Sequence, residues 1–399
     1  MPEQFLHGVE VLELTNGNRP VQTVRSSVIG VIGTAPDADA SVFPLNKPVL
    51  LINEPTKAGL LGATGTLKDA MEAIYAQVGA VVVVVRVEEG ADEAATLTNI
   101  VGDETQKSGV HAFKAAETQL KVTPRILIAP GFTSQRPASA ANPVISALTG
   151  IAREMRSVIF ADGPTASYAD AITHASDWGS DRVFIIAPGV KAWDRETNAP
   201  MVRPASAYAA GTQAWIDNNK GFWWSPSNHI LQGVVGTSRP ISFGLSDKNT
   251  EANLMNENKI ATVIHKDGYR LWGNRTTATD PLWAFLAVRR TADLVYDSIE
   301  NAMLWAMDRP FSAQLLLDIV GTVNAYLRQL KAVGAILGGE AWIDPELNTK
   351  ENFQAGKLYV DFDIEPAAPM EHLTFRAHRN GDYYEELVIE VQKAIEASR

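Results

Sequence analysis

The chain has 399 residues, of which 46% are hydrophobic and 20% are charged, so its composition is that of a folded globular protein and excludes disordered or collagen-like chains. It contains no cysteine, which excludes disulfides, thiolate metal sites and cysteine nucleophiles and fits folding in a reducing cytoplasm. Its net charge of −11 argues against a nucleic acid partner, and the longest apolar run, over residues 78–85, is too short to span a membrane.

The first twenty residues form a terminal segment that differs from the rest of the chain. A short β-type run precedes the turn signal Asn16-Gly17, and its hydrophobic members are Val9, Val11, Leu12 and Leu14. These residues have no evident hairpin partner nearby. We therefore expect residues 1–20 to be an arm whose strand pairs elsewhere.

Residues 21–260 alternate between strand and helix patterns. We expect strands at residues 28–33, 48–53, 80–87, 125–129, 157–162 and 182–187, and helices near residues 67–77, 143–156, 166–176 and 205–218. Several of these strands are continuous apolar runs, which is typical of strands buried on both faces. The pattern predicts an α/β domain with a mostly parallel sheet.

After about residue 260 the pattern changes to long helices followed by strands. Asp280 and Pro281 are good first residues for one long amphipathic helix that reaches residue 306, and a second helix runs from Ser312 to Gly334. Residues 357–364 and 372–377 are predicted strands. Residues 261–382 are therefore expected to form an α+β domain.

The last segment, residues 383–399, is compatible with two structures. The alternating β-branched run Leu387, Val388, Ile389 and Val391 favours a strand, whereas the spacing of Tyr384, Leu387, Val391 and Ile395 also fits a helix. Periodicity alone does not decide between them. We take this segment as a C-terminal arm that contributes a strand.

A search for catalytic or cofactor motifs finds none that is complete. Gly59, Gly62 and Gly65 precede a predicted helix, but they lack the Gly-Lys-Ser/Thr ending of a phosphate-binding loop. His372 and His378 are the closest histidines, and on a strand they would lie far apart. We expect no catalytic residue, cofactor or metal ion. The main alternative is an α/β enzyme, because Asp162 and Asp194 lie near the carboxyl ends of predicted strands, where such folds bind ligands.

One segment, residues 258–276, resembles the core motif of contractile tail sheath proteins, in the short form of P2-like phages and R-type pyocins or tailocins. Similar stretches occur in order at residues 7–11, 43–49, 124–131, 221–228 and 324–331. The resemblance therefore covers essentially the whole chain. The motif residues are Gly268, Tyr269, Arg270, Trp272, Gly273, Asn274, Arg275 and Thr276.

The resemblance implies a structural subunit, not an enzyme. Such subunits polymerise around a tail tube in a strained extended state and contract to drive the tube through the target cell envelope. Residues 21–260 would form an outer domain and residues 261–382 an inner domain, whose sheet is extended by the terminal arms of neighbouring subunits. A baseplate component of the same particle is a further alternative.

The resemblance also implies partners and a location. The partners would be further copies in hexameric layers, the tail tube protein, and baseplate and tail terminator proteins, with assembly in the bacterial host cytoplasm and a final place in a virion tail or tailocin. Arg328 and Lys331 share a helix face, where basic residues would complement the helix dipole in any protein. The resemblance implies that they face the tube.

Overall fold

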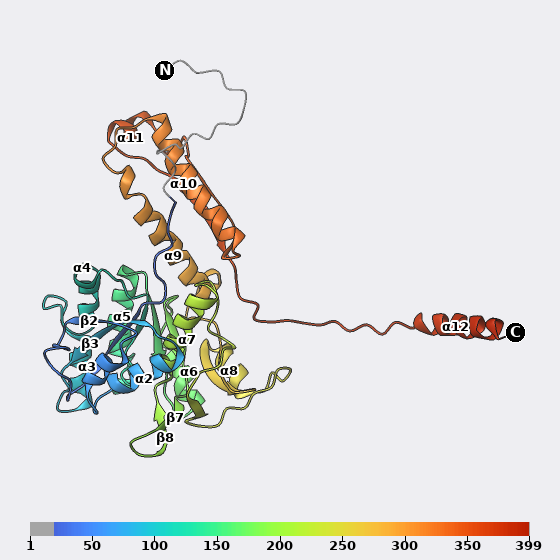
Figure 1. Cartoon of the computed structure of the whole chain (residues 1–399), viewed down its shortest axis with the longest axis horizontal. Helices are drawn as coiled ribbons and strands as arrows, with labels where there is room; N and C mark the ends of the chain where they lie inside the picture. Colours follow the sequence, from blue (N-terminus) through green and yellow to red (C-terminus); the bar gives the residue numbers. More distant parts are fainter. Residues whose placement is uncertain (1–19, 399) are drawn as a thin grey trace, which may run out of the picture. The chain divides into compact units, whose positions relative to one another are not determined.

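The computed structural model, drawn in Figure 1, describes residues 20–398. Its largest feature is an eight-stranded sheet of order β11-β10-β6-β5-β4-β1-β3-β2. The central strands are parallel, and an antiparallel strand closes each edge, β2 (Pro48–Ile52) on one side and β11 (Tyr269–Trp272) on the other. The parallel strands are β10 (Ile260–His265), β6 (Val183–Ile186), β5 (Val158–Asp162), β4 (Ile126–Ile128), β1 (Ile29–Thr34) and β3 (Val81–Val87).

Helices cover both faces of this sheet, which explains why its strands are continuous apolar runs. The core on one face includes residues of α2 (Leu67–Gln77) and α7 (Ala205–Asn219). The core on the other face includes residues of α3 (Glu93–Val101), α5 (Pro143–Glu154) and α6 (Tyr168–Ser176). Every strand and helix predicted for residues 21–260 is present, and α2 has the predicted bounds.

Smaller elements complete this α/β domain. A three-stranded antiparallel sheet has the order β8-β7-β9 and consists of β7 (Val190–Asp194), β8 (Ala199–Arg203) and β9 (Val234–Thr237). The short helices are α1 (Pro55–Ala58), α4 (Ala116–Leu120) and α8 (Glu251–Glu257), with 3-10 turns at η1 (Gly59–Leu61), η2 (Gly109–Ala115) and η3 (Pro137–Ser139).

The large sheet continues beyond the change of pattern at residue 260. Strand β10 pairs in parallel with β6, with Ile260 opposite Ile185, and β11 pairs with β10 through a hairpin. Residues 260–272, most of which we expected to begin the α+β domain, are therefore the last two strands of the α/β sheet. The sequence pattern missed this because the place of β10 in the sheet depends on a partner strand more than 70 positions earlier, which no local pattern indicates.

The α+β part consists of two helices packed on a small sheet. The helices are α9 (Leu286–Ala302) and α10 (Ala313–Ala332), and the sheet pairs β12 (Ile336–Trp342) with β13 (Asp361–Pro366). Their shared core includes Val295, Leu327 and Ile336. The predicted second helix is confirmed, since the Ser312 hydroxyl caps α10 at the amide of Leu315 and the backbone turns at Gly334 with a φ of +79°.

The predicted single helix over residues 280–306 is wrong, because three separate pieces occupy this range. Asp280 caps only the short turn η4 (Pro281–Trp283), then α9 follows, and η5 (Leu304–Ala306) ends the region. The interruption has a tertiary cause. Phe285 is extended and forms a β-bridge with Arg275, and the Ala284 carbonyl accepts a hydrogen bond from the amide of Thr276.

The strand predictions for this part were only partly right. The strand predicted at residues 357–364 begins later, at Asp361, and residues 372–377 have no regular secondary structure. Strand β12 was not predicted, because Gly338 and Gly339 interrupt its apolar pattern. The short helix α11 (Lys350–Gln354) lies between β12 and β13 in the chain.

Residues 370–399 form a separate unit, of which residues 370–398 are described. This unit has an irregular first part and then helix α12 (Tyr383–Ala397). The strand predicted at Leu387–Val391 is therefore wrong for the single chain. The helix prevails because it forms its backbone hydrogen bonds within one segment, whereas a strand needs a partner strand. The predicted N-terminal strand, with Val9, Val11, Leu12 and Leu14, lies outside the described residues.

Candidate functional site

The core motif lies at the junction between the sheet edge and α9. Gly268 turns the β10–β11 hairpin with a φ of +109°, and Gly273 leaves β11 with a φ of +135°. A Cβ atom at Gly273 would lie 2.7 Å from the Cα atom of Ala261, so only glycine fits there. The amide of Leu286, the first residue of α9, donates to the Asn274 carbonyl at 3.0 Å. The motif therefore fixes where α9 begins.

The remaining motif residues have visible structural roles. Tyr269, Arg270 and Trp272 are in β11, and the Arg270 guanidinium donates to the carbonyls of Lys266 and Asn228. The Thr276 hydroxyl donates to the Ala284 carbonyl, and the Arg275 guanidinium lies 5.1 Å from the centre of the Phe285 ring. These contacts hold the chain in place and need no bound ligand.

A cluster of ion pairs joins α9 to the α/β domain. We call this cluster the α9 clamp; it consists of Arg289, Arg290, Asp293, Asp297 and Glu300 on α9 and Arg125, Arg156, Arg182 and Asp217 on the α/β domain. Most of these side chains are buried, and Arg290 and Asp293 are only 3% and 2% exposed. Buried charges are tolerated in such a place only when each is paired.

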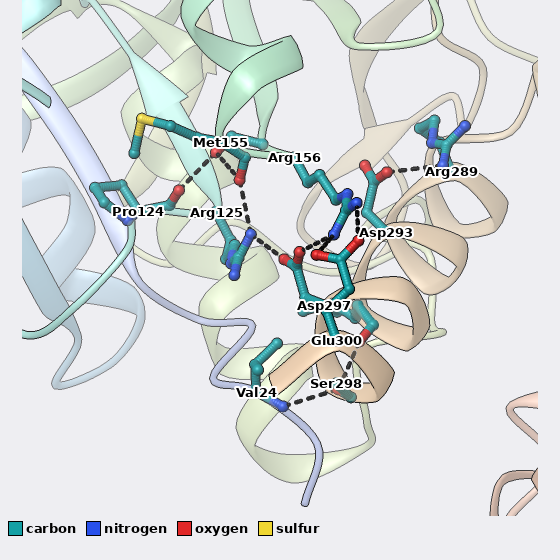
Figure 2. Close-up of polar contacts among 12 residues, drawn as sticks. Val24, Pro124, Arg125, Met155, Arg156, Arg289, Asp293, Asp297, Ser298 and Glu300 are labelled. Carbon is teal, nitrogen blue, oxygen red and sulfur yellow. Dashed lines mark hydrogen bonds and ion pairs between the residues drawn. The ribbon is translucent and has the colours of Figure 1, made fainter. Parts of the chain in front are cut away.

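Besides the pair between Arg290 and Asp217, the clamp has two groups of contacts. In the first, Asp293 accepts hydrogen bonds from Arg182 at 2.6 and 3.0 Å and from Arg289 at 2.7 Å. In the second, Arg125 and Arg156 point toward the end of α9, where both pair with Asp297 (Figure 2). Arg156 also holds both carboxylate oxygens of Glu300, at 2.7 and 2.5 Å, and so lowers the pKa of Glu300.

The chain segment before β1 runs beside α9 and adds to this junction. The amide of Val24 donates to the Ser298 hydroxyl at 3.1 Å (Figure 2), and Arg290 donates to the Ser26 carbonyl. The Thr23 hydroxyl lies 3.0 Å from the Tyr326 hydroxyl of α10. The segment that follows the predicted N-terminal arm is thus tied to both long helices.

Sequence reasoning missed the α9 clamp. The available signal was the run Arg289, Asp293 and Asp297, in which charged residues recur every four residues along one helix face. That pattern is also typical of a solvated helix surface, so it does not by itself predict burial. The arginines that complete the clamp come from the chain more than 100 positions earlier.

The other predicted site residues lie on the surface. Arg328 and Lys331 are both exposed on the last turns of α10, and the described part of the chain offers neither an ion-pair partner. Leu387, Val388, Ile389 and Val391 lie on α12 and are 49–57% exposed. Their roles toward other subunits or a tube stay predictions.

The carboxylates that suggested an enzyme have structural partners instead. Asp162 is buried at the end of β5, where its carboxylate accepts hydrogen bonds from the amide and hydroxyl of Ser206, and burial raises its pKa to about 6. Asp194 pairs with Arg203 at 2.6 Å. A nearby cavity, lined by Thr66, Arg203 and other residues, has a volume of about 40 Å³, which leaves space for a few water molecules at most.

Within residues 20–398, no group of three or more His, Asp or Glu side chains is arranged to hold a metal ion. The helices described there include none that is long and apolar enough to cross a bilayer.

Three family models match the chain in succession. Residues 26–87 match the N-terminal region of domain III of the tail sheath protein Gp18, residues 105–277 the phage tail sheath protein central domain, and residues 278–379 the phage tail sheath C-terminal domain. The chain belongs to the phage tail sheath protein family. It is therefore a structural protein and not an enzyme, as the sequence predicted.

Two sequence relatives show which members of the tail sheath family this chain is similar to. The chain is 38% identical over 388 residues to a putative prophage major tail sheath protein of Pseudomonas aeruginosa, covering 96% of this chain and 99% of the relative. It is 37% identical over 397 residues to the tail sheath protein of Escherichia phage P2, covering 97% and 98%. The predicted resemblance to the short form of the family is confirmed, and with it the role as a subunit of a contractile tail sheath.

Solved structures confirm the fold. The helical sheath of the anti-feeding prophage in the contracted state matches with a TM-score of 0.69 and 18% identity, covering 94% of this chain and all of that one. The PVC sheath complex, also contracted, matches with a TM-score of 0.68 and 18% identity over 96% of this chain and all of that one.

Proposed function

We propose that this chain polymerises around a tail tube in a strained extended state, held together by arms exchanged between subunits, and that it contracts to drive the tube through the target cell envelope. Baseplate and tail terminator proteins bind the two ends of the polymer, and assembly takes place in the bacterial host cytoplasm. Several family properties support the proposal, but one observation on this chain carries it: the apolar side chains of residues 370–398 are exposed.

This exposure is large for a folded protein. Phe375 is 86% exposed, Met370 77% and Leu373 58%, and the stripe on α12 is about half exposed at each position. Burying each of these side chains would stabilise a complex by about 1.5–3 kcal/mol, before the cost of ordering the segment. A segment of this kind is therefore built to be covered by another molecule. In a polymer of identical subunits, another copy is always adjacent.

The pairing strand of the C-terminal arm comes earlier in the chain than the sequence suggested. We place its pairing strand at residues 372–377, where Leu373 and Phe375 would lie on one face of an extended segment and His372, Thr374 and Arg376 on the other. The two-stranded sheet β12-β13 is its acceptor, since each of its strands has one edge that pairs with no other strand of residues 20–398. The N-terminal arm, with Val9, Val11, Leu12 and Leu14, is the second donor.

Pairing between arms would keep neighbouring subunits connected while the subunits move during contraction. A single short strand binds weakly, because about 1 kcal/mol net per backbone hydrogen bond is offset by the ordering of each residue. Two arms in a closed ring act at high effective concentration, so the network persists while the bodies of the subunits rotate. A small free-energy gain per subunit on contraction then sums to a large total over the whole sheath.

Two sets of substitutions test the arm. Leu373→Ser with Phe375→Ser removes the apolar face of the proposed strand, whereas the control, His372→Ser with Arg376→Ser, alters the opposite face. We expect wild type and control to form cylinders in negative-stain images, and the test variant to stay a folded monomer by circular dichroism and light scattering. Cylinders of ordinary length from the test variant contradict the arm mechanism, and closed rings from wild type indicate a baseplate component instead.

A further inference from the structure

An exposed patch at one edge of the large sheet combines aromatic rings with positive charge. We call it the basic aromatic patch and define it as Trp215, Lys220, Trp224, His229, Lys266 and Arg270. The Lys220 ammonium lies 5.0 Å from the centre of the Trp224 ring and 5.9 Å from that of Trp215, and 2.9 Å from Nε2 of His229. Trp215 and Trp224 are 36% and 46% exposed.

The patch is continuous across the loop that borders β11. The amide of Leu271 in β11 donates to the His229 carbonyl, and the Arg270 guanidinium donates to the Asn228 carbonyl. Within residues 20–398, no carboxylate forms an ion pair with Lys220, Lys266 or Arg270. In a chain with a net charge of −11, this local excess of positive charge is unusual.

An acidic segment lies near the opposite edge of the same sheet. Every ionisable side chain from residue 88 to residue 104 is acidic: Glu88, Glu89, Asp92, Glu93, Asp103 and Glu104. Of these, Glu104 pairs with Lys114 and Asp92 caps α3, while Glu88, Glu89 and Glu93 are exposed and have no cationic partner among the described residues.

The topology keeps these two surfaces apart in one molecule. The acidic segment follows β3 and lies at the carboxyl end of the sheet. The patch runs along β11 at the sheet edge, from Lys266 after the end of β10 to Trp215 and Lys220 at the far end of α7. That end of α7 lies toward the amino end of the sheet, because α7 begins with Ser206 bonded to Asp162 at the end of β5. Four strands separate β10 from β3 in the sheet order, which puts the surfaces roughly 25–30 Å apart. They can meet only between two copies.

We propose that the basic aromatic patch of one subunit binds the acidic segment at residues 88–104 of the next subunit. The contact joins two different surfaces, so each copy that binds leaves both surfaces available for further copies, and repetition produces a ring or a helix. Exposed tryptophans and a cluster of unpaired cations are typical of the residues that dominate binding energy and orientation. This inference rests on the proposed polymerisation and adds a head-to-tail contact between α/β domains.

Charge reversal and charge exchange test the contact. We expect Glu88→Lys with Glu89→Lys, and separately Lys220→Glu with Lys266→Glu, to raise the critical concentration for polymerisation by about tenfold or more. The chain that carries all four substitutions should polymerise nearly as well as wild type, because the charges again match. Lys121→Glu, a reversal at an exposed lysine elsewhere, is the control and should change little. Lys266→Glu alone alters only the exposed hairpin and serves if the pair with Lys220 disturbs the fold.

The outcomes separate this contact from the proposed function. Wild type that forms no polymer contradicts the polymerisation itself. If wild type polymerises and the charge-reversed chains do so at an unchanged critical concentration, the contact is wrong. The contact is equally wrong if both charge-reversed chains polymerise poorly and the chain with all four substitutions does not polymerise better than they do. Weaker assembly of wild type in about 0.5 M salt, with no further salt dependence in the reversed chains, supports it.

Discussion

The guanidinium of Arg182 donates from both Nη atoms to the carboxylate of Asp293, at 2.6 and 3.0 Å, across 111 positions of sequence. This pair is at the centre of the α9 clamp, and its side chains are 10% and 3% exposed. Because α9 also packs with α10 and β13, the pair connects the part of the subunit that carries the small sheet to the α/β body. A subunit that transmits force needs such a junction.

The clamp predicts a large loss of stability when its acidic centre is removed. Asp293→Asn would leave Arg182 and Arg289 buried beside a neutral amide, and we expect the free energy of unfolding to fall by about 3–5 kcal/mol. Glu300→Gln is the matched control, because this side chain is 64% exposed and its loss should cost about 0–1 kcal/mol. Urea unfolding of the monomer measures both. Equal costs for the two variants contradict the idea that the buried centre dominates.

The buried carboxyl group of Asp162 predicts how the free energy of unfolding depends on pH. Its pKa of about 6 in the folded chain lies above the ordinary value of 3.8, so the folded state binds this proton more tightly than the unfolded state does. Its contribution to stability is then fully present below about pH 4 and is lost as the pH rises through 6. We expect Asp162→Asn, which cannot ionise, to be more stable relative to wild type at pH 7 than at pH 4.5. Urea unfolding at both values measures this difference, and a constant difference would count against it.

Two glycines predict opposite effects of the same substitution. Gly273→Ala forces a Cβ atom against Ala261 at a φ of +135°, and we expect it to lower stability by about 1–3 kcal/mol. Gly321 lies in α10 with no atom within 4 Å of an added Cβ, so Gly321→Ala should raise stability by about 0.5–1 kcal/mol. Thermal unfolding of the monomer tests both signs, and a neutral Gly273→Ala would show that the junction tolerates strain.

The tube-facing role of Arg328 and Lys331 predicts a specific assembly defect. Exposed ion pairs contribute about 0–1 kcal/mol each, which is weak enough to be released during contraction but adds up over many copies. We expect reversal of both charges to glutamate to impair assembly on purified tubes while polymerisation without tubes is unchanged. Co-sedimentation with tubes measures this, and Lys350→Glu, on α11, is a control for added negative charge. Normal binding by the double variant excludes these residues from the tube contact.

The parallel strands of the α/β domain could be predicted from the sequence by itself. A strand buried on both faces needs a continuous apolar run, and β1, β3, β5 and β6 each have one, bounded by turn residues. The same is true of α10, whose cap, apolar period and final glycine are all local signals. The family could also be predicted, from the resemblance of residues 258–276 to the core motif of known tail sheath proteins and not from composition or periodicity.

Two features were decided only by the tertiary structure, and a third could not be predicted from periodicity. The break between η4 and α9 depends on the bridge from Phe285 to Arg275, which overrides a good local helix signal. The α9 clamp depends on arginines brought from distant strands, and no local period encodes such a pairing. The last segment is a helix and not a strand, although Leu387, Val388 and Val391 fit both periods. Its side chains are exposed in the single chain, so burial does not select a strand, and the hydrogen bonds that a helix forms within itself determine the outcome.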